Sequence, residues 1–416
     1  MTPALPPTET ISQEEARQIM LAAQGFRAFP QQAQQPAAKP DVLRLIRQMG
    51  MLQIDTIHVI ARSPYLTLWS RLGDYNPAWL DELLAEGALF EYWAHAMCFL
   101  PVEDYPLYRR AMLERTGGWG DAAQWVAEHA GVVEQVLERI RREGALRSAD
   151  FKNGNKPAGG WWNWKDEKTA LECLLWLGEL MIARRQNFQR VYDLRQRVLP
   201  GWEDGPDAAH VPSREEVQEL FTLRAVQALG AAHAGWVPDY YRLPKTGNLP
   251  RLEALAEVGR LRRVQIEGLP GPAYLDPLAP PPQPLNFTTV LSPFDPIVWD
   301  RKRLKELHNF DYTIEVYTPA HKRSFGYFTL PILHNGKVVG RLDPKAHRAE
   351  GRFEVKAIAL EPGVEATDEL ATGLLDCLQR LAQWHGTPEL VIGRVAPEGL
   401  AKRLSTDGFV CTGQIA

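Results

Sequence analysis

The heptapeptide LQIDTIH at residues 52–58 places one amide, Gln53, and one carboxylate, Asp55, among apolar and β-branched neighbours. In an extended segment, residues two apart face the same side, whereas a helix would turn them to nearly opposite sides. An amide both donates and accepts hydrogen bonds, and an ionised carboxylate only accepts, so the two could orient and activate a nucleophilic water. Spacing alone leaves a second interpretation open, in which Asp55 is a local cap or an ion-pair partner.

Other common catalytic signatures are missing from the sequence. There is no HExxH, HxH or Cys/His cluster, and His58, His95 and His129 are isolated from other metal-ligating residues. There is also no Walker A loop, no GxGxxG after an expected strand and no GxSxG elbow. Nucleotide hydrolysis, redox chemistry and serine hydrolysis are therefore disfavoured, and we expect no metal and no cofactor.

Length and composition indicate a chain of several domains. The chain has 416 residues, 45% of them hydrophobic and 24% charged, as in globular proteins of two to four domains. The first residues, MTPALPPTET, resemble no secretory signal, and no apolar run reaches the ~18 residues of a membrane span. We therefore expect a cytoplasmic protein with reduced core thiols at its four separated cysteines, Cys98, Cys173, Cys377 and Cys411.

Positive charge is concentrated in one part of the chain. Residues 139–197 hold thirteen Lys+Arg and seven Asp+Glu, a balance of +6, so the remainder carries −10 of the total of −4. Such asymmetry is a weak indication of a surface facing a polyanion, and an ordinary solvated surface is equally compatible. The same segment contains WWNW at 161–164, whose tryptophans suit either nucleic-acid contact or core packing.

The helix signals begin with two capping boxes, Ser12 with Glu15 and Ser213 with Glu216. Asp41 is expected to cap a helix that ends at Gly50, and Thr56 could cap a helix after the opening motif. Alternating and aromatic-rich runs predict hairpins or paired strands, and each follows expected helices. These runs cover residues 88–101, 180–194 and 262–275.

The recurring pattern of short helices followed by a hairpin outlines a winged helix, and it occurs about three times. We therefore predict three tandem winged-helix units, at 1–125, 126–205 and 206–284. The proline-rich tract 275–287 reads as a linker. Beyond it, 285–416 is predicted to be a β-rich, barrel-like domain with an Asn-Gly hairpin turn in HNG at 334–336 and a terminal helix at about 367–385. The fold class is α+β.

Several long blocks of the sequence resemble the winged-helix DNA glycosylases of the AlkZ/YcaQ family. The likeness extends from about residue 10 to about residue 400, and the opening motif resembles the Gln-apolar-Asp form of the YcaQ branch. One departure is Ala96, where relatives would carry an acidic residue after YWAH. The blocks are MLQIDTIHVIARSPYLTLWSRLG, EYWAHAMCFLP, NFQRVYDLRQRVLP, LSPFDPIVWDRKR and YTPAHKRSFGYFTLPILHNGKVVGRLDPKAHR.

The resemblance implies a function. Gln53 and Asp55 match the family's catalytic motif. The implied activity is monofunctional excision of N7-alkylated purines and unhooking of DNA interstrand crosslinks. The partner would be double-stranded DNA, bound by a monomer associated with the nucleoid. Within the basic segment, the candidate phosphate contacts are Arg184, Arg185 and Arg190.

Two other function classes remain open on the residues alone. A non-enzymatic winged-helix regulator would bind an operator sequence and release no base. A nuclease would normally need clustered carboxylates and a divalent metal, and no such cluster stands out in the sequence.

Overall fold

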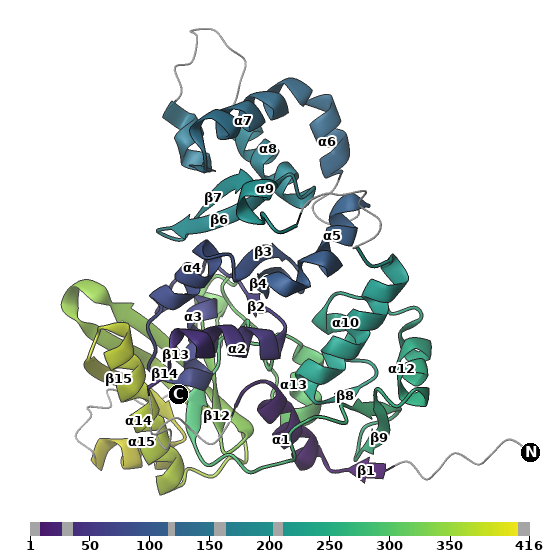
Figure 1. The fold of residues 1–416 in the computed structure, drawn as a ribbon. Helices are drawn as coiled ribbons and strands as arrows, with labels where there is room; N and C mark the ends of the chain where they lie inside the picture. The colour runs from purple at the N-terminus through teal and green to yellow at the C-terminus, as the bar shows by residue number, and fades with distance from the viewer. Residues whose placement is uncertain (1–8, 27–35, 115–120, 154–163, 203–210, 407–416) are drawn as a thin grey trace, which may run out of the picture. The chain divides into compact units, whose positions relative to one another are not determined.

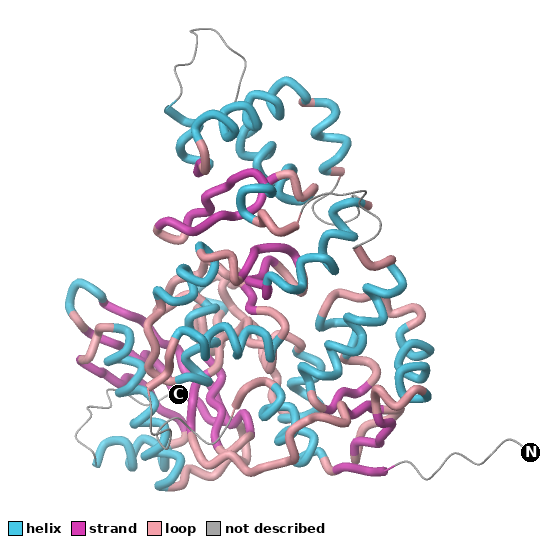
Figure 2. The backbone as a smooth tube through the Cα atoms, in the orientation of Figure 1, coloured by secondary structure: helices cyan, strands magenta, loops and turns pink. Residues whose placement is uncertain are grey.

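The fold is mixed α+β, as the sequence predicts, with helices and strands along the whole described chain (Figure 2). The computed structural model describes residues 9–26, 36–114, 121–153, 164–202 and 211–406. Two of the tryptophans of WWNW, Trp161 and Trp162, lie outside these residues, and Trp164 begins a helix. No helix in the described ranges is both long and apolar enough to cross a membrane.

The chain forms two compact units. Unit 1 comprises Met1–Met49, Gln53–Asn76 and Phe221–Ala416, and unit 2 comprises Gly50–Leu52 and Pro77–Leu220. These boundaries differ from the four-part division predicted from the sequence. The four-part division stays a prediction.

One order of elements occurs three times along the chain (Figure 1). A helix and a short strand are followed by two helical segments and a hairpin, and the last strand pairs with both others. The first copy consists of α2 (Lys39–Met49), β2 (Leu52–Gln53), α3 (Ser63–Leu72), α4 (Ala78–Ala85), β3 (Leu89–Trp93) and β4 (Met97–Pro101). The second consists of α7 (Ala130–Glu143), β5 (Leu146–Arg147), η3 (Ser148–Asn153), α8 (Trp164–Trp176), β6 (Leu180–Gln186) and β7 (Gln189–Leu194). The third consists of α10 (Arg214–Leu229), β8 (Ala231–His233), α11 (Val237–Tyr240), α12 (Asn248–Glu257), β9 (Arg262–Ile266) and β10 (Ala273–Leu275).

Further elements join these copies. The strand β1 pairs in parallel with β9 and so extends the third copy's sheet to the order β1-β9-β10-β8. In unit 2, α6, α7 and α8 pack together, and α8 also packs against β6. The additional elements before the C-terminal region are β1 (Glu9–Ile11), α1 (Gln13–Ala23), η2 (Val102–Asp104), α5 (Tyr105–Leu113), α6 (Ala122–Glu128) and α9 (Arg195–Val198).

The C-terminal part of unit 1 is a five-stranded sheet in the order β11-β12-β13-β14-β15. Its strands are antiparallel except that β15 runs parallel to β14, and the described strands form an open sheet, not a closed barrel. The helix α14 packs against β11 and β15. The elements are β11 (Thr288–Val290), α13 (Arg301–His308), η4 (Ala320–Lys322), β12 (Leu330–His334), β13 (Lys337–His347), η5 (Arg348–Glu350), β14 (Arg352–Leu360), α14 (Asp368–His385), β15 (Glu389–Ala396) and α15 (Glu398–Thr406).

Local sequence signals account for many boundaries. Both capping boxes form: the Glu15 N–H donates to Ser12 Oγ (3.1 Å) and the Glu216 N–H donates to Ser213 Oγ (3.2 Å). Asn335 and its following glycine adopt positive φ angles of 46° and 78° in the turn between β12 and β13. This is the turn chemistry that Asn-Gly predicts.

Two cap predictions were wrong. The helix α2 already begins at Lys39, because Pro40 fits its first turn, so Asp41 lies inside the helix and accepts from the Ala38 N–H (2.9 Å). Thr56 caps no helix, because α3 begins only at Ser63 and has no side-chain cap. The thiol prediction is confirmed for the described cysteines, Cys98, Cys173 and Cys377, which are free and buried, while Cys411 lies outside the described residues.

A buried ion pair fixes α3 within unit 1. The Arg71 guanidinium donates to both carboxylate oxygens of Asp295, at 2.5 and 2.9 Å, and both side chains are 0% exposed. Arg71 Nε also donates to the Gln24 carbonyl (2.8 Å), and the guanidinium lies over the Phe26 ring at 4.1 Å. At the other end of α3, the hydroxyl groups of Ser63 and Ser292 are hydrogen-bonded.

Replacing Asp295 with alanine should destabilise unit 1 strongly, because it leaves a buried guanidinium without its counterion. We expect a loss of about 3–5 kcal/mol in the free energy of unfolding, measured by urea denaturation. The control is Asp311→Ala, which removes the exposed Lys305–Asp311 pair (2.8 Å) and should change stability little. Equal stability of the two variants would contradict the stabilising role of the buried Arg71–Asp295 pair.

Candidate active site

The Gln53–Asp55 motif lies where β2 ends. Gln53 is the last residue of β2, and residues 54–58 have no helical or strand structure, so the pair is not separated by a helical turn. Leu52 and Ile60 are buried on either side of the motif, at 1% and 0% exposure. Gln53 and Asp55 are themselves half-buried, whereas Thr56 and His58 are exposed.

The amide of Gln53 has an unused acceptor. Its Oε1 atom is buried and has no hydrogen-bond partner among the described residues. Leaving such an acceptor unsatisfied costs roughly 1–3 kcal/mol, so buried polar atoms of this kind usually bind water or a ligand. An amide in this state is suited to holding a water molecule.

The Asp55 carboxylate makes one local hydrogen bond. Its Oδ1 accepts from the Ile57 N–H (2.7 Å), and the described residues offer it no ion pair. Burial raises the pKa of Asp55, and the Ile57 N–H offsets this only in part. The ion-pair interpretation of this residue therefore finds no support among the described residues, and the hydrogen bond leaves most acceptor positions of the carboxylate unused.

An arginine from the C-terminal sheet holds the chain just after the motif. Arg348, in the turn between β13 and β14, donates through Nη2 to the Ile60 carbonyl and to His58 Nε2 (2.8 Å). His385, at the end of α14, contacts the same carbonyl through Nε2 (2.8 Å) and lies 3.3 Å from Arg348 Nη2. All of these residues belong to unit 1. Residues 58–60 are thus held by side chains about 290 or more positions away.

The Arg348 contact requires a neutral His58. The Nε2 atom accepts the hydrogen bond, so it cannot carry a proton at the same time. Burial, followed by the charges of Arg348, Arg62 and His385, lowers the pKa of His58 to about 4. The contact is therefore present at neutral pH.

Of the three predicted phosphate contacts, two take part in ion pairs within unit 2. Arg185, whose side chain is 3% exposed, donates to both oxygens of the buried Glu91 (2.5 and 2.7 Å). Arg190 pairs with Glu172 (3.0 Å) and also approaches Glu91 (3.4 Å). Only Arg184 is exposed, on β6. Phosphate binding by these residues stays a prediction.

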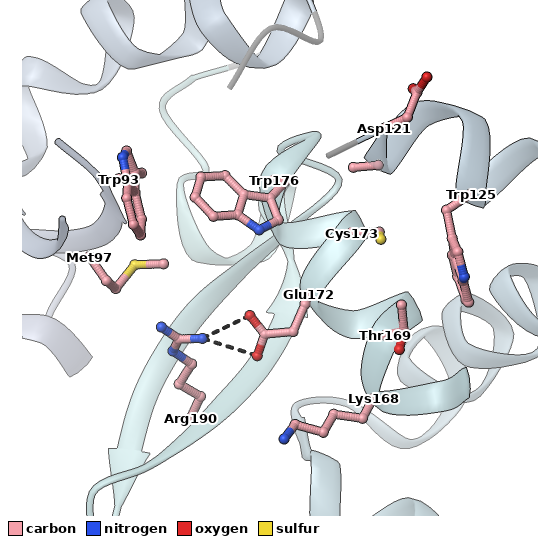
Figure 3. Close-up of a pocket in the computed structure, with 11 residues that line it drawn as sticks. Trp93, Met97, Asp121, Trp125, Lys168, Thr169, Glu172, Cys173, Trp176 and Arg190 are labelled. Atoms are coloured by element: carbon pink, nitrogen blue, oxygen red, sulfur yellow. Dashed lines mark hydrogen bonds and ion pairs between the residues drawn. The ribbon is translucent and has the colours of Figure 1, made fainter. Parts of the chain in front are cut away.

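A cavity of about 830 Å³ lies beside the Glu172–Arg190 pair (Figure 3). It offers no evident reaction centre, because the Glu172 carboxylate is already bound by Arg190 and by the Tyr192 hydroxyl (2.8 Å). Burial also raises the pKa of the neighbouring Cys173 thiol, which disfavours a reactive thiolate. Most of its wall is aromatic or apolar, and the lining residues are Trp93, Met97, Asp121, Ala122, Trp125, Lys168, Thr169, Glu172, Cys173, Trp176 and Arg190.

The described residues contain no group of three or more His, Cys, Asp or Glu side chains arranged to hold a metal ion. Arg348 and His385 are not among the site residues predicted from the sequence, and His58 has no metal-ligating His or Cys neighbour in the sequence. No local pattern signals their contact, because the residues meet only through the tertiary fold. Residue type and spacing single out Gln53 and Asp55 as a pair, but their catalytic role rests on the family resemblance and stays a prediction.

Comparisons with known proteins define the class as enzymes that hydrolyse the N-glycosyl bond of DNA. Residues 46–384 match the family described as "DNA glycosylase AlkZ-like", and the chain belongs to this family. The fold is similar to that of Streptomyces sahachiroi DNA glycosylase AlkZ, with a TM-score of 0.59 at 14% sequence identity. That likeness covers 93% of this chain and 100% of the other.

Replacing Arg348 with alanine should release residues 58–60 and misplace the motif. We expect kcat for base release to fall roughly ten- to hundredfold, since small displacements of catalytic groups have effects of this size. Burial is the main cause of the low pKa of His58 and the charge of Arg348 is the next, so the pKa, followed by NMR, should rise above about 4 when that charge is removed.

Arg352→Ala is the matched control, because Arg352 lies on the adjoining strand and pairs with the half-exposed Glu350 (2.6 Å). It should leave both kcat and the pKa of His58 unchanged. A His58 pKa that stays near 4 in the Arg348→Ala variant would contradict the contact.

Proposed function

We propose that this DNA glycosylase excises N7-alkylated purines and unhooks alkylation-induced interstrand crosslinks by a monofunctional, Asp55-dependent hydrolysis. The proposal rests on the burial and the hydrogen bonding of Asp55 and Gln53. A half-buried carboxylate with a single local hydrogen bond lies two residues from a buried amide oxygen that has no partner among the described residues. Such a pair suits a positioned water.

The chemistry of the lesion explains why so small a site suffices. Alkylation at N7 makes the purine cationic, so the base departs as a neutral molecule and needs no strong acid to protonate it. What remains is to stabilise the positive charge that develops on the sugar and to supply the attacking water. One carboxylate and one orienting amide meet these needs.

Asp55 supplies the negative charge. A charge pair about 4 Å apart at an effective dielectric constant of about 20 contributes roughly 4 kcal/mol. That corresponds to about a thousandfold in rate. The motif LQIDTIH contains no lysine that could attack the sugar, so water is the nucleophile and no strand cleavage accompanies base release.

A crosslinked purine is tethered to the opposite strand and cannot turn freely into a deep pocket. Both motif side chains are half-buried. This suits attack on such a lesion from a shallow, water-accessible site. On this proposal the enzyme acts as a monomer on duplex DNA.

One order of helices and strands occurs three times, which supports the interpretation that the chain carries three winged-helix units. Within the second, exposed Arg184 is the residue best placed for phosphate contact, because Arg185 and Arg190 are committed to ion pairs. A regulator without enzymatic activity is not favoured, because the chain belongs to a glycosylase family.

Incubation with an N7-methylguanine duplex or a mustard-crosslinked duplex in EDTA tests the proposal. Wild-type protein should leave alkali-labile abasic sites and release the crosslink. A regulator would leave the DNA intact, and a metal-dependent nuclease would cleave no DNA because EDTA removes its metal. Asp55→Asn should abolish release, and Gln53→Ala should slow it with DNA affinity retained.

The same variants separate chemistry from structure. The Asp55→Asn substitution keeps an acceptor for the Ile57 N–H, and it removes a carboxylate whose ionised form burial disfavours, so the melting temperature should stay equal or rise. Near wild-type base release by Asp55→Asn would refute the role of Asp55. Loss of DNA binding in Gln53→Ala would show a structural role instead.

The rate should also depend on pH through Asp55. Only the ionised carboxylate is active, so kcat/KM should fall as pH decreases through the pKa of Asp55, which burial raises above the ordinary 3.8. A pH profile of single-turnover excision measures this acidic limb. His58→Gln should retain the limb, and a wild-type profile without it down to pH 3.8, where a carboxyl with a raised pKa is more than half protonated, would contradict the role of Asp55.

A further inference from the structure

Exposed aromatic side chains gather on one loop of unit 1. The described residues contain seven exposed large hydrophobic side chains, and three of them lie in the short stretch from Tyr317 to Tyr327. Tyr317 is 93% exposed, Phe325 is 43% exposed and Tyr327 is 37% exposed. A cluster of exposed aromatic residues marks a binding surface more often than scattered single ones do.

The same loop carries positive charge. His321 and Lys322 are exposed, Arg323 is partly exposed, and residues 316–327 contain no Asp or Glu. The Lys322 backbone N–H donates to the Pro319 carbonyl (2.9 Å), and its side chain makes no hydrogen bond or ion pair within the described residues. The Arg323 guanidinium lies 4.9 Å from the Tyr327 ring centroid and donates through Nε to the Thr318 carbonyl (2.8 Å). The basic residues 321–323 therefore lie between exposed aromatic side chains on both sides.

The loop is held in shape by one buried carboxylate. Glu315, 9% exposed, accepts three consecutive backbone N–H groups: Oε1 from Ser324 (2.7 Å), and Oε2 from Phe325 (2.8 Å) and Gly326 (3.1 Å). Burial works to raise the pKa of Glu315, but these donors outweigh it and the pKa is lowered. The carboxylate therefore stays ionised and closes the loop at neutral pH.

The end of the loop is also pressed against β13. Gly326 adopts a φ of 141°, and a side chain there would collide with the Asp343 side chain. The Phe325 ring lies 4.0 Å from the Arg341 guanidinium, which itself donates to Glu361 (2.7 Å). The aromatic side chains are thus exposed from a fixed backbone, so binding would order little additional chain.

We propose that residues 315–327 form a DNA contact surface, in which Tyr317 stacks on a base unpaired at the lesion and Lys322 and Arg323 contact phosphates. Positive side chains flanked by exposed rings match the phosphates and bases of a nucleic-acid strand, and the absence of Asp and Glu from residues 316–327 favours a polyanion over a protein partner. This rests on the DNA substrate of the proposed function but not on which adduct is excised.

The test measures binding by the full-length protein, without catalysis. Two fluorescent duplexes serve as probes: one undamaged, and one with a tetrahydrofuran abasic-site analogue opposite 2-aminopurine. Affinity is measured over a range of salt concentrations for Tyr317→Ala and Lys322→Glu. The controls are Leu278→Ala, at an 86% exposed position, and Lys402→Ala, whose side chain is 74% exposed.

Tyr317→Ala should weaken binding to the abasic duplex about tenfold and remove the quenching of 2-aminopurine, as expected for the loss of one stacked base. Its effect on the undamaged duplex should be smaller. Lys322→Glu should weaken binding to both duplexes and lower the slope of log affinity against log salt by roughly one. Both controls should bind as wild type.

Wild-type affinity, quenching and salt slope in both variants would overturn the proposal and would leave a protein partner as the occupant of this surface. Because no N7-alkylated base is present, the result is independent of the proposed adduct. Loss of binding in the variants from a protein that excises no N7-alkylpurine would support this surface and refute the proposed function.

Discussion

The buried pair between Arg71 and Asp295 is the constraint on which the geometry of unit 1 depends. It joins α3 to a segment more than two hundred residues later, and the Ser63–Ser292 hydrogen bond repeats this attachment at the other end of the helix. The helix α3 directly follows residues 53–62. Its position therefore fixes the C-terminal end of the segment that carries the motif. A fully buried ion pair tolerates little displacement, since either charge alone would be costly.

The local elements were predictable where short-range chemistry decides them. The Ser12–Glu15 and Ser213–Glu216 boxes and the Asn335 turn each involve residues within three positions, and the sequence shows them directly. Spacing also showed that Gln53 and Asp55 would share one side of an extended segment, but their catalytic role came from the family resemblance and stays a prediction. Errors at Asp41 and Thr56 arose because several nearby residues can begin a helix, and tertiary packing selects among them.

Long-range pairing could not be predicted in this way. Arg185 looked like a surface cation at the tip of a basic hairpin, but the buried Glu91, almost a hundred residues earlier, takes up its charge. Arg348 belongs to a polar turn whose sequence carries no sign of His58 or Ile60. Charge counts along a sequence therefore overestimate the cations available to DNA, because they cannot show which ones a folded protein neutralises internally.

The Arg348 contact also bears on how the protein is made. Translation produces the motif early, whereas Arg348 and His385, which hold residues 58–60, emerge 288 and 325 residues after Ile60. A truncated or partly synthesised chain can thus contain both motif side chains and still lack the contacts that order the segment following them. Ordering of the segment that follows the candidate catalytic motif is therefore coupled to synthesis of the chain as far as Arg348 and His385.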